Sequence, residues 1–173
     1  MDKKTPFYSL HKKYNAKFIS FAGYKMPIQY QGVNIEHNHV RNFVGVFDVS
    51  HMAQIMITGI DAFNLVQRLT TNDIAKMRDG KVQYSCMLNV DGGIVDDLLV
   101  YRFSSDAYML VVNAANAEKD LNWISQHSTD DANINNITHD KGLLAIQGPK
   151  SYSILQKLTD IKLDVRSNLL TPW

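Results

Sequence analysis

The sequence predicts an α+β fold with a largely antiparallel sheet and flanking helices. Two apolar segments, residues 82–90 and 94–103, are separated by residues 91–93, Asp-Gly-Gly, which is typical of a β-hairpin. Other segments either alternate apolar and polar residues, as strands do, or space their apolar residues as helices do. Because hairpins and helices are mixed along the chain, we expect mainly antiparallel strand pairing.

The expected helices follow from capping residues and from helical spacing of apolar side chains. Thr5 and Pro6 are typical of an N-cap followed by proline at the first helical position. Asp61 has the position of an N-cap before a strongly apolar helical face, and Gly45 follows the end of a more polar helix. The expected helices cover residues 5–15, 33–44, 61–69, 117–124 and 151–158.

The expected strands are recognised by alternation or by continuous apolar character. Residues 17–21 and 54–58 alternate, whereas residues 108–112 are continuously apolar, as in a strand covered on both faces. Residues 22–27 are expected to form a loop, because Ala-Gly and Met-Pro interrupt the pattern. The expected strands cover residues 17–21, 46–49, 54–58, 82–90, 94–103, 108–112, 132–138 and 143–147.

Composition narrows the classes of function. The chain has 173 residues, which suits one domain or one domain plus part of a second. Its 18 Lys and Arg against 17 Asp and Glu give a formal charge of +1, which argues against nucleic acid or an anionic membrane as partner. No apolar segment approaches the ~20 residues of a membrane span. A single cysteine, Cys86, cannot form an internal disulfide and favours a reducing compartment, with the cytoplasm as the expected location.

Two adjacent carboxylates, Asp96 and Asp97, stand at the entrance to an apolar strand. Because side chains alternate along a strand, only one of them shares the face of Leu99 and Tyr101. We expect that carboxylate to point inward, into a pocket, where loss of hydration disfavours its charged form unless a partner compensates. Such a group suits proton transfer or recognition of a polar ligand. The alternative is that both residues cap the turn before them.

Polar side chains also occur on segments that otherwise look like core strands. Tyr84, Tyr101 and Asn113 need hydrogen-bond partners if they are buried, and around one inward aspartate they would form a polar floor in an apolar pocket. Such a pocket suits a flat heteroaromatic ligand. Met52 and Leu99 are expected to be core residues in either case. The alternative is that each polar group only satisfies neighbouring backbone.

Two further groups of polar residues do not predict a catalytic or metal site. Asp48, Ser50 and His51 lie too close in sequence for a catalytic triad, which is assembled from separate segments, so capping or packing is expected. His37 and His39 have no cluster of cysteine, histidine and carboxylate nearby, so no metal site is expected. The chain also contains neither a P-loop nor a dinucleotide-binding glycine motif.

Several short motifs, in one order and spacing, then point to a known family. They are Thr5-Pro6-Phe7, Phe21-Ala22-Gly23-Tyr24-Lys25-Met26-Pro27, Glu36-His37, Gly45-Val46-Phe47-Asp48-Val49-Ser50-His51-Met52, Thr71-Asn72-Asp73, Gly92-Gly93-Ile94-Val95-Asp96-Asp97-Leu98, Val111-Val112-Asn113-Ala114-Ala115-Asn116, Glu118-Lys119-Asp120 and Gln147-Gly148-Pro149. With these motifs the chain resembles the T protein of the glycine cleavage system, an aminomethyltransferase, over nearly all of residues 4–158. Tyr24 stands where the family usually has tryptophan, and Ala53-Gln54 where Gly-Glu is usual.

The resemblance implies a folate-binding fold and a transfer reaction. Tetrahydrofolate would take the methylene carbon of an aminomethyl group carried on the lipoyl arm of the H protein, and ammonia would be released. Matching the motif places the family's essential aspartate at Asp97. The residues expected around the pterin are Met52, Tyr84, Leu99, Tyr101 and Asn113.

Family members are longer than this chain, and their further domains complete the folate pocket. The resemblance therefore implies an N-terminal portion of the folate-binding domain in residues 1–163, followed by an irregular tail, residues 164–173. An incomplete pocket leaves apolar surface uncovered, so self-association is expected. The alternative function is a folate-binding or interaction module without catalysis.

Overall fold

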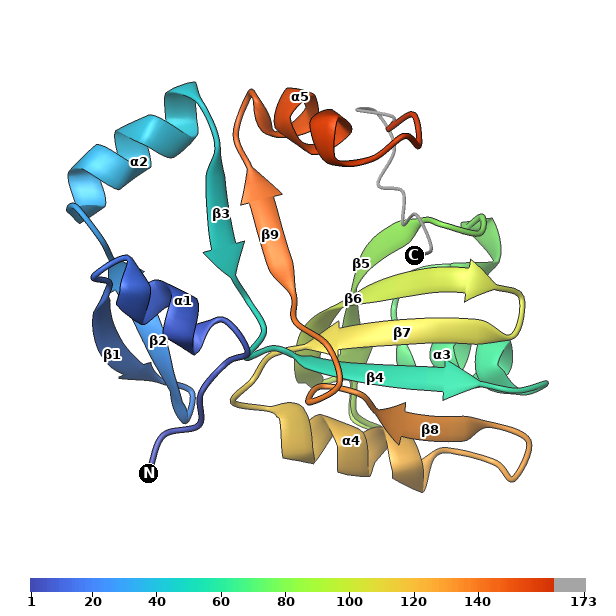
Figure 1. The fold of residues 1–173 in the computed structure, drawn as a ribbon. Helices are drawn as coiled ribbons and strands as arrows, with labels where there is room; N and C mark the ends of the chain where they lie inside the picture. The colour runs from blue at the N-terminus through green and yellow to red at the C-terminus, as the bar shows by residue number, and fades with distance from the viewer. Residues whose placement is uncertain (164–173) are drawn as a thin grey trace. The chain divides into compact units, whose positions relative to one another are not determined.

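The computed structural model describes residues 1–163, and the tail expected for residues 164–173 lies outside the described residues. The described chain forms two units, which are considered separately (Figure 1). Unit 1 comprises Met1–His51 with Asp140–Leu163, and unit 2 comprises Met52–His139. All pairings between the strands of the described residues are antiparallel, which confirms the predicted α+β class.

Unit 1 contains two small sheets, each of two strands, and short helices. Strand β1 pairs with β2, and β3 pairs with β9, which comes from the far end of the described chain. The elements of unit 1 are α1 (Tyr8–Lys13), β1 (Lys17–Phe21), β2 (Tyr24–Gln29), α2 (Val33–Asn42), β3 (Gly45–Asp48), β9 (Leu144–Gln147), α5 (Ser151–Leu155) and the 3₁₀ helix η2 (Gln156–Leu158).

The prediction of a loop at residues 22–27 is wrong, because most of that segment belongs to strand β2. Ala22 and Gly23 both have positive φ, 48° and 78°, and so form a two-residue hairpin turn that reverses the chain directly into β2. Pro27 is tolerated in this strand because it pairs with Phe18, next to a register shift in β1. The first turn position holds alanine rather than the usual asparagine or glycine, which hid the hairpin.

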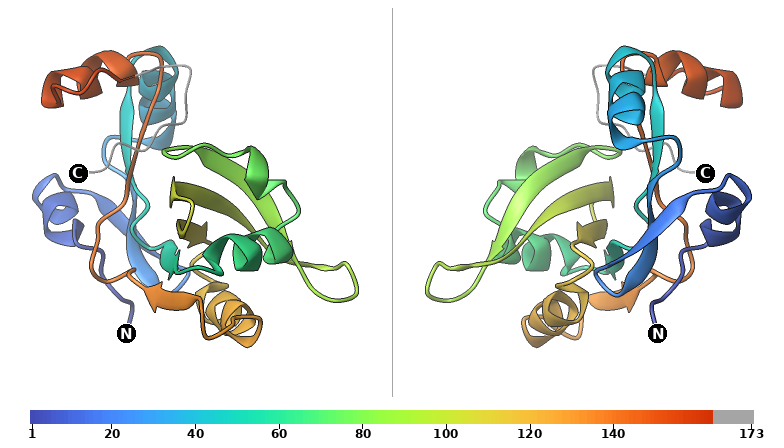
Figure 2. Two further views of the ribbon diagram at one scale, coloured as in Figure 1. Left: turned by 90° about the vertical axis from the view of Figure 1, so that its right-hand side faces the viewer. Right: turned by 90° about the vertical axis from the view of Figure 1, so that its left-hand side faces the viewer.

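Unit 2 is built on a sheet of five strands in the order β5-β6-β7-β4-β8. Figures 1 and 2 show α3 and α4 lying beside this sheet. The elements of unit 2 are β4 (Ala53–Thr58), α3 (Ala62–Leu69), the 3₁₀ helix η1 (Ile74–Lys76), β5 (Val82–Leu88), β6 (Ile94–Ser104), β7 (Ala107–Val112), α4 (Ala117–Gln126) and β8 (Asn133–Asn136). Strand β7 lies in the middle of the sheet, which explains its continuous apolar sequence.

The predicted hairpin of residues 82–103 is confirmed as β5 and β6. Asn89 organises its turn: its side-chain oxygen accepts hydrogen bonds from the backbone N–H groups of Asp91 (3.1 Å) and Gly93 (2.7 Å). Gly92 supplies the positive φ of 81° that the turn requires. This hairpin fixes the register of β6, and therefore the face on which each member of the acidic pair lies.

The core of unit 2 lies between one face of the sheet and the two helices. Helix α3 contributes Ala62, Leu65, Val66 and Leu69, and α4 contributes Ile124. The strands contribute Ile55, Ile57, Met87, Leu98, Val100, Tyr108, Leu110 and Val112. Because strand side chains alternate, the residues between these positions belong to the opposite face of the sheet.

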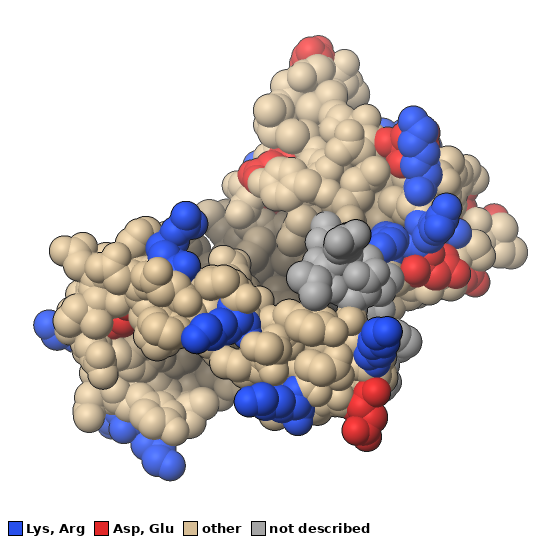
Figure 3. Space-filling model, turned by 90° about the horizontal axis from the view of Figure 1, so that it is seen from above, with Lys and Arg blue, Asp and Glu red and all other residues tan. Residues whose placement is uncertain are grey.

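The surface agrees with the balanced charge of the chain. On the face drawn in Figure 3, lysine and arginine side chains stand singly or in small groups among uncharged residues. Among residues 1–163, no helix is long and apolar enough to cross a membrane. Within the same residues, no group of three or more histidine, cysteine or acidic side chains is placed to hold a metal ion.

Candidate functional site

Four of the six predicted site residues, Tyr84, Asp97, Leu99 and Tyr101, lie on one face of the unit 2 sheet, opposite to α3 and α4. Strand pairing aligns Asp97 with Cys86, Leu99 with Tyr84 and Val111, and Tyr101 with Met109. Met52 directly precedes β4 and Asn113 directly follows β7, and the Asn113 side chain reaches Asp97. The paired residues of this face form three rows: Cys86 and Asp97; Tyr84, Leu99, Val111 and Gln54; Val82, Tyr101, Met109 and Met56.

Asp97 is hydrogen-bonded on both of its carboxylate oxygens. The Tyr84 hydroxyl donates to Oδ2, and the Asn113 side-chain amide donates to Oδ1 at 3.1 Å. The hydrogen bond to this carboxylate raises the pKa of the Tyr84 hydroxyl, with burial adding to the effect. The arrangement holds a carboxylate in a defined orientation while leaving it accessible to a ligand.

The expectation that Asp97 is the inward acid of the pair is wrong for the described residues. Asp97 is exposed, whereas Asp96 is buried with 4% of its surface accessible. Asp97 does share the face of Leu99 and Tyr101, as alternation requires, but α3 and α4 cover the other face, on which Leu98 lies. The helices therefore bury Asp96, and Asp97 lies on the face without a helix of unit 2.

Asp96 is held by three N–H groups at the junction of β7 and α4. The Asn113 backbone N–H donates to Oδ2 (3.1 Å), and the side-chain amides of Asn113 (2.9 Å) and Asn116 (2.7 Å) donate to Oδ1. Burial by itself would raise the pKa of Asp96, but the hydrogen bonds that it accepts outweigh burial and hold this pKa below its ordinary value. Asp96 is therefore a buried carboxylate that keeps its charge.

A second acid, Asp120 in the first turn of α4, faces Asp96 and is completely buried. Burial, the hydrogen bond shared with Asp96 and repulsion by that carboxylate raise the pKa of Asp120 to about 8, although the nearby Lys119 ammonium, 3.9 Å from Oδ1, opposes the shift. With both acids ionised, neither oxygen of Asp120 has a hydrogen-bond partner among the described residues. Its contact with Asp96 becomes a hydrogen bond only when one of the two acids carries a proton. At neutral pH the two acids therefore share one negative charge and one proton.

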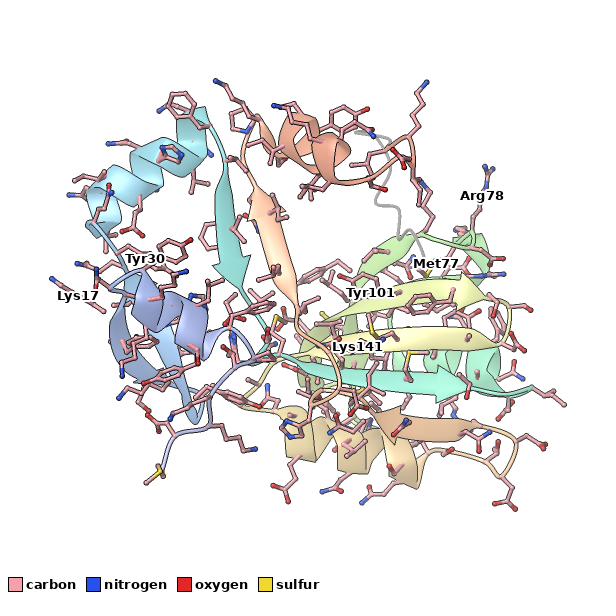
Figure 4. All side chains as sticks on the ribbon, viewed as in Figure 1. Lys17, Tyr30, Met77, Arg78, Tyr101 and Lys141 are labelled. Carbon is pink, nitrogen blue, oxygen red and sulfur yellow. The ribbon has the colours of Figure 1, made fainter. Side chains whose placement is uncertain are left out.

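The remaining site residues form an apolar floor beside Asp97. Tyr101 projects from β6 (Figure 4), and burial raises the pKa of its hydroxyl. Its neighbours on β7, Met109 and Val111, are both buried, at 8% and 1% accessible surface. Leu99 is partly buried between them and Tyr84. A carboxylate, a phenol and an amide thus stand at one edge of an apolar surface.

Two cavities, of about 660 and 640 Å³, lie in unit 1, and Asp97 lines neither. Both are lined by His11, Tyr30 and Asp48. His11 joins the other two: its Nε2 lies 2.8 Å from an Asp48 carboxylate oxygen and its Nδ1 lies 2.6 Å from the Tyr30 hydroxyl. His11 therefore uses both ring nitrogens within unit 1, one on Asp48 and one on Tyr30.

The structure agrees that Asp48, Ser50 and His51 form no triad. The Asp48 carboxylate accepts hydrogen bonds from Thr5 (2.5 Å) and from the Ser50 backbone N–H (3.0 Å), and it contacts His11. The Ser50 hydroxyl bonds to the backbone of Leu143 and not to His51. His51 Nδ1 is buried with no hydrogen-bond partner among the described residues. The segment serves packing, as expected from sequence.

Similarity to known proteins shows the family to which the chain belongs. The family model described as GCVT N-terminal domain matches residues 7–170. The chain belongs to this family. A solved structure of the same kind, the glycine cleavage system aminomethyltransferase T of Bartonella henselae, superposes with a TM-score of 0.85 at 36% sequence identity. The superposition covers 91% of this chain and 44% of that one.

Curated relatives of this GCVT N-terminal domain are named aminomethyltransferase. The protein of Flavobacterium psychrophilum is 52% identical over 161 residues, which are 93% of this chain and 45% of the relative. The protein of Thermoanaerobacter pseudethanolicus is 51% identical over 158 residues, 91% of this chain and 43% of the relative. The chain thus spans somewhat less than half the length of the relatives that it matches.

Sequence reasoning missed the buried half of this GCVT-domain site. The sequence pattern singles out Asp96 only as the neighbour of Asp97, and it indicates no role for Asn116 or Asp120. A signal was present: Asn116 occupies the N-cap position of α4 and Asp120 follows four residues later, one helical turn on. Gln54 was also missed, although its side chain is buried and its Nε2 has no partner among the described residues.

Proposed function

We propose that this chain is the folate-handling portion of a tetrahydrofolate-dependent aminomethyltransferase of glycine cleavage. The reaction moves the methylene carbon of an aminomethyl group, carried on the lipoyl arm of the H protein, to tetrahydrofolate and releases ammonia. Membership of the GCVT N-terminal domain family supports this reaction class. The single observation in the structure that supports it most is Asp97, held by Tyr84 and Asn113 at the edge of an apolar surface.

The chemistry of these residues fits a reduced pteridine. Such a ring is flat, with apolar faces and a periphery of N–H donors and acceptors. Leu99, Tyr101 and Val111 offer an apolar surface for a ring face, and the Asp97 carboxylate offers an acceptor for ring N–H groups. Asn113 commits its side-chain N–H₂ to Asp96 and Asp97, so its amide oxygen faces away from the acids as a further acceptor.

Asp97 is the proposed catalytic residue. It would hold the folate near its reacting nitrogens and manage the proton that moves as carbon passes from one nitrogen to another. A positioned general acid or base of this kind contributes on the order of 10²–10⁴-fold in rate. Met52 and Tyr84 would help to confine the ring at the end of the sheet that carries Asp97 and Asn113.

A second candidate function is a folate-binding or interaction module without catalysis. One observation favours it: Asp97 is exposed. A general base works best in a site that excludes water, because its interactions weaken in high dielectric. On this view the chain provides a binding face without a catalytic role for Asp97. Location in the cytoplasm fits either function.

Calorimetric titration with tetrahydrofolate, followed by a transfer assay with aminomethylated H protein, tests both functions. Binding with ammonia release supports the enzyme, and binding without release supports the module. The absence of binding would refute both for this chain. The decisive variant is Asp97→Asn, which we expect to weaken binding and to abolish any transfer.

The matched control is Asp91→Asn, which removes the same charge from the exposed turn of the same hairpin. It should bind tetrahydrofolate as the parent chain does. If Asp97→Asn binds and reacts as well as this control, Asp97 has no role in the reaction.

A further inference from the structure

The two buried acids, Asp96 and Asp120, belong to the side of the sheet opposite to Asp97, the proposed catalytic carboxylate. Asp96 and Asp97 are neighbours in β6 and point to opposite faces of the sheet. One side chain reaches both: Asn113 Nδ2 lies 2.9 Å from Asp96 Oδ1 and 3.1 Å from Asp97 Oδ1. Asn113 therefore links the buried acid on one face to the exposed acid on the other.

The amide orientation of Asn113 is fixed by these contacts. Its Nδ2 faces oxygen acceptors in every direction that the structure shows: both carboxylates and, at 3.1 Å, the Asp97 backbone carbonyl. Only the N–H₂ group can donate to such oxygens, so the reversed amide would place oxygen against oxygen. The orientation depends on Asp96 remaining a charged acceptor at a fixed place.

Asp120 sets the place and charge of Asp96. Two carboxylates cannot hydrogen-bond to each other, so the contact between these buried acids requires a proton on one of them. The three N–H donors gather on Asp96, which makes it the charged member and leaves the proton on Asp120. The O–H of Asp120 then donates to Asp96 from the α4 side.

We infer that Asp120 is a positioning residue, whose proton holds Asp96 and, through Asn113, the Asp97 carboxylate in place for a ligand. The consequence for ligand binding rests on the proposed function, whereas the coupling among the four side chains does not. When Asp120 loses its proton, two adjacent buried carboxylates repel each other. Asp96 then shifts and Asn113 loses its fixed acceptor, so the hold on Asp97 weakens.

Few other ionisable groups lie close to Asp96 and Asp120 among the described residues. Asp120 is faced by Asp96 from β6 and by Lys119 from its own helix. The Lys119 ammonium also donates to the Val95 backbone carbonyl. On the opposite face, Cys86 pairs with Asp97 across β5 and β6, so an ionisable thiol lies beside the site. A Cys86→Ser control is therefore needed in every pH series.

The direct test is an NMR titration of the 173-residue chain, labelled with ¹³C in aspartate carboxyls and ¹⁵N in asparagine side chains. We expect one aspartate to titrate near pH 8 and the Asn113 side-chain N–H₂ signals to move with it. Asp120→Asn keeps a hydrogen-bond donor without a titrating proton, so both changes should vanish. Cys86→Ser should retain both. The inference is overturned if no aspartate titrates above pH 6, or if Asn113 does not respond when Asp120 titrates.

Binding provides the second readout. For the parent chain and Cys86→Ser, we expect the Kd for tetrahydrofolate to be about tenfold weaker at pH 9 than at pH 7, the equivalent of one oriented hydrogen bond. Asp120→Asn should bind equally at both pH values. Binding that is independent of pH in the parent chain would contradict the positioning role. If nothing binds at either pH, the proposed function fails, and the NMR titration still decides whether Asp120 controls Asn113.

Discussion

Replacing Asp120 by asparagine should change how the stability of unit 2 depends on pH. The pKa of Asp120 is about 8 in the folded chain, whereas an unperturbed aspartate titrates near 3.9. Between these values the folded chain holds a proton that the unfolded chain has released. The free energy of unfolding therefore falls as pH rises, and this loss is complete only above pH 8.

The magnitude follows from the size of the shift. One proton of difference corresponds to at most about 1.4 kcal/mol per pH unit, so up to about 2.7 kcal/mol is lost between pH 5 and pH 7. The contribution of Asp96 to the unfolding free energy depends on pH in the opposite direction. Because the pKa of Asp96 is lowered in the folded chain, its stabilising contribution is lost only as pH falls through the acidic range. Asp96 therefore contributes little to the change between pH 5 and pH 7.

The assay is urea unfolding at pH 5, 6 and 7, followed by the fluorescence of Trp123, which packs against the core of unit 2 from α4. Both chains carry Trp173→Phe, so that Trp123 is the only tryptophan signal. Histidine titration contributes equally to both chains and cancels in their difference. The difference in unfolding free energy between Asp120→Asn and its parent should grow by about 2 kcal/mol from pH 5 to pH 7. Parallel curves for the two chains would refute a protonated Asp120.

Three further outcomes are expected. Asp48→Ala should destabilise unit 1 by about 3 kcal/mol in urea denaturation, because buried Thr5 and His11 lose their shared acceptor, and a loss below about 1 kcal/mol would show that the network is dispensable. Leu65→Ala, at a fully buried position of α3, should cost about 2–5 kcal/mol, whereas the control Ile60→Ala, 89% exposed, should change stability by less than about 0.5 kcal/mol. The exposed apolar side chains of the β3–β9 sheet, Val46 at 61% and Leu144 at 43%, should promote self-association, which light scattering would detect at high concentration and which Val46→Lys should reduce; a chain that stays monomeric at all concentrations would contradict this.

The elements of the fold could be read from sequence wherever local signals and tertiary packing agree. The hairpin at Asn89–Gly93 has both a turn sequence and two apolar flanks, and it forms as predicted. The first hairpin has weaker local signals: Ala22 adopts a positive φ that its sequence does not favour, and Pro27 normally argues against a strand. There, pairing with β1 overrides the local preferences of the chain.

The sequence predicts which side chains share a face of the sheet, but it does not predict whether that face is buried. Alternation places Asp97 with Leu99 and Tyr101 without any structure, and strand register brings Tyr84 to the same face. Residues 98–101 of β6 are apolar or aromatic at every position, so the sequence does not say which face the helices cover. That choice depends on where α3 and α4 pack, which is a property of connections and not of the strand itself.

The adjacent positions of Asp96 and Asp97 in β6 explain why the two acids have different surroundings. Adjacent residues of a strand are the closest positions that point to opposite faces, so Asp96 and Asp97 bring one carboxylate into the core and one to the face that carries the proposed site. A buried charge needs several hydrogen-bond donors, and the turn from β7 into α4 provides them from Asn113 and Asn116. Because Asn113 serves both acids, the cost of burying Asp96 is offset by the same groups that orient Asp97. An asparagine at position 96 would need no proton on Asp120, but it would present an N–H₂ group as well as an oxygen to Asn113, and the amide would lose its single preferred orientation.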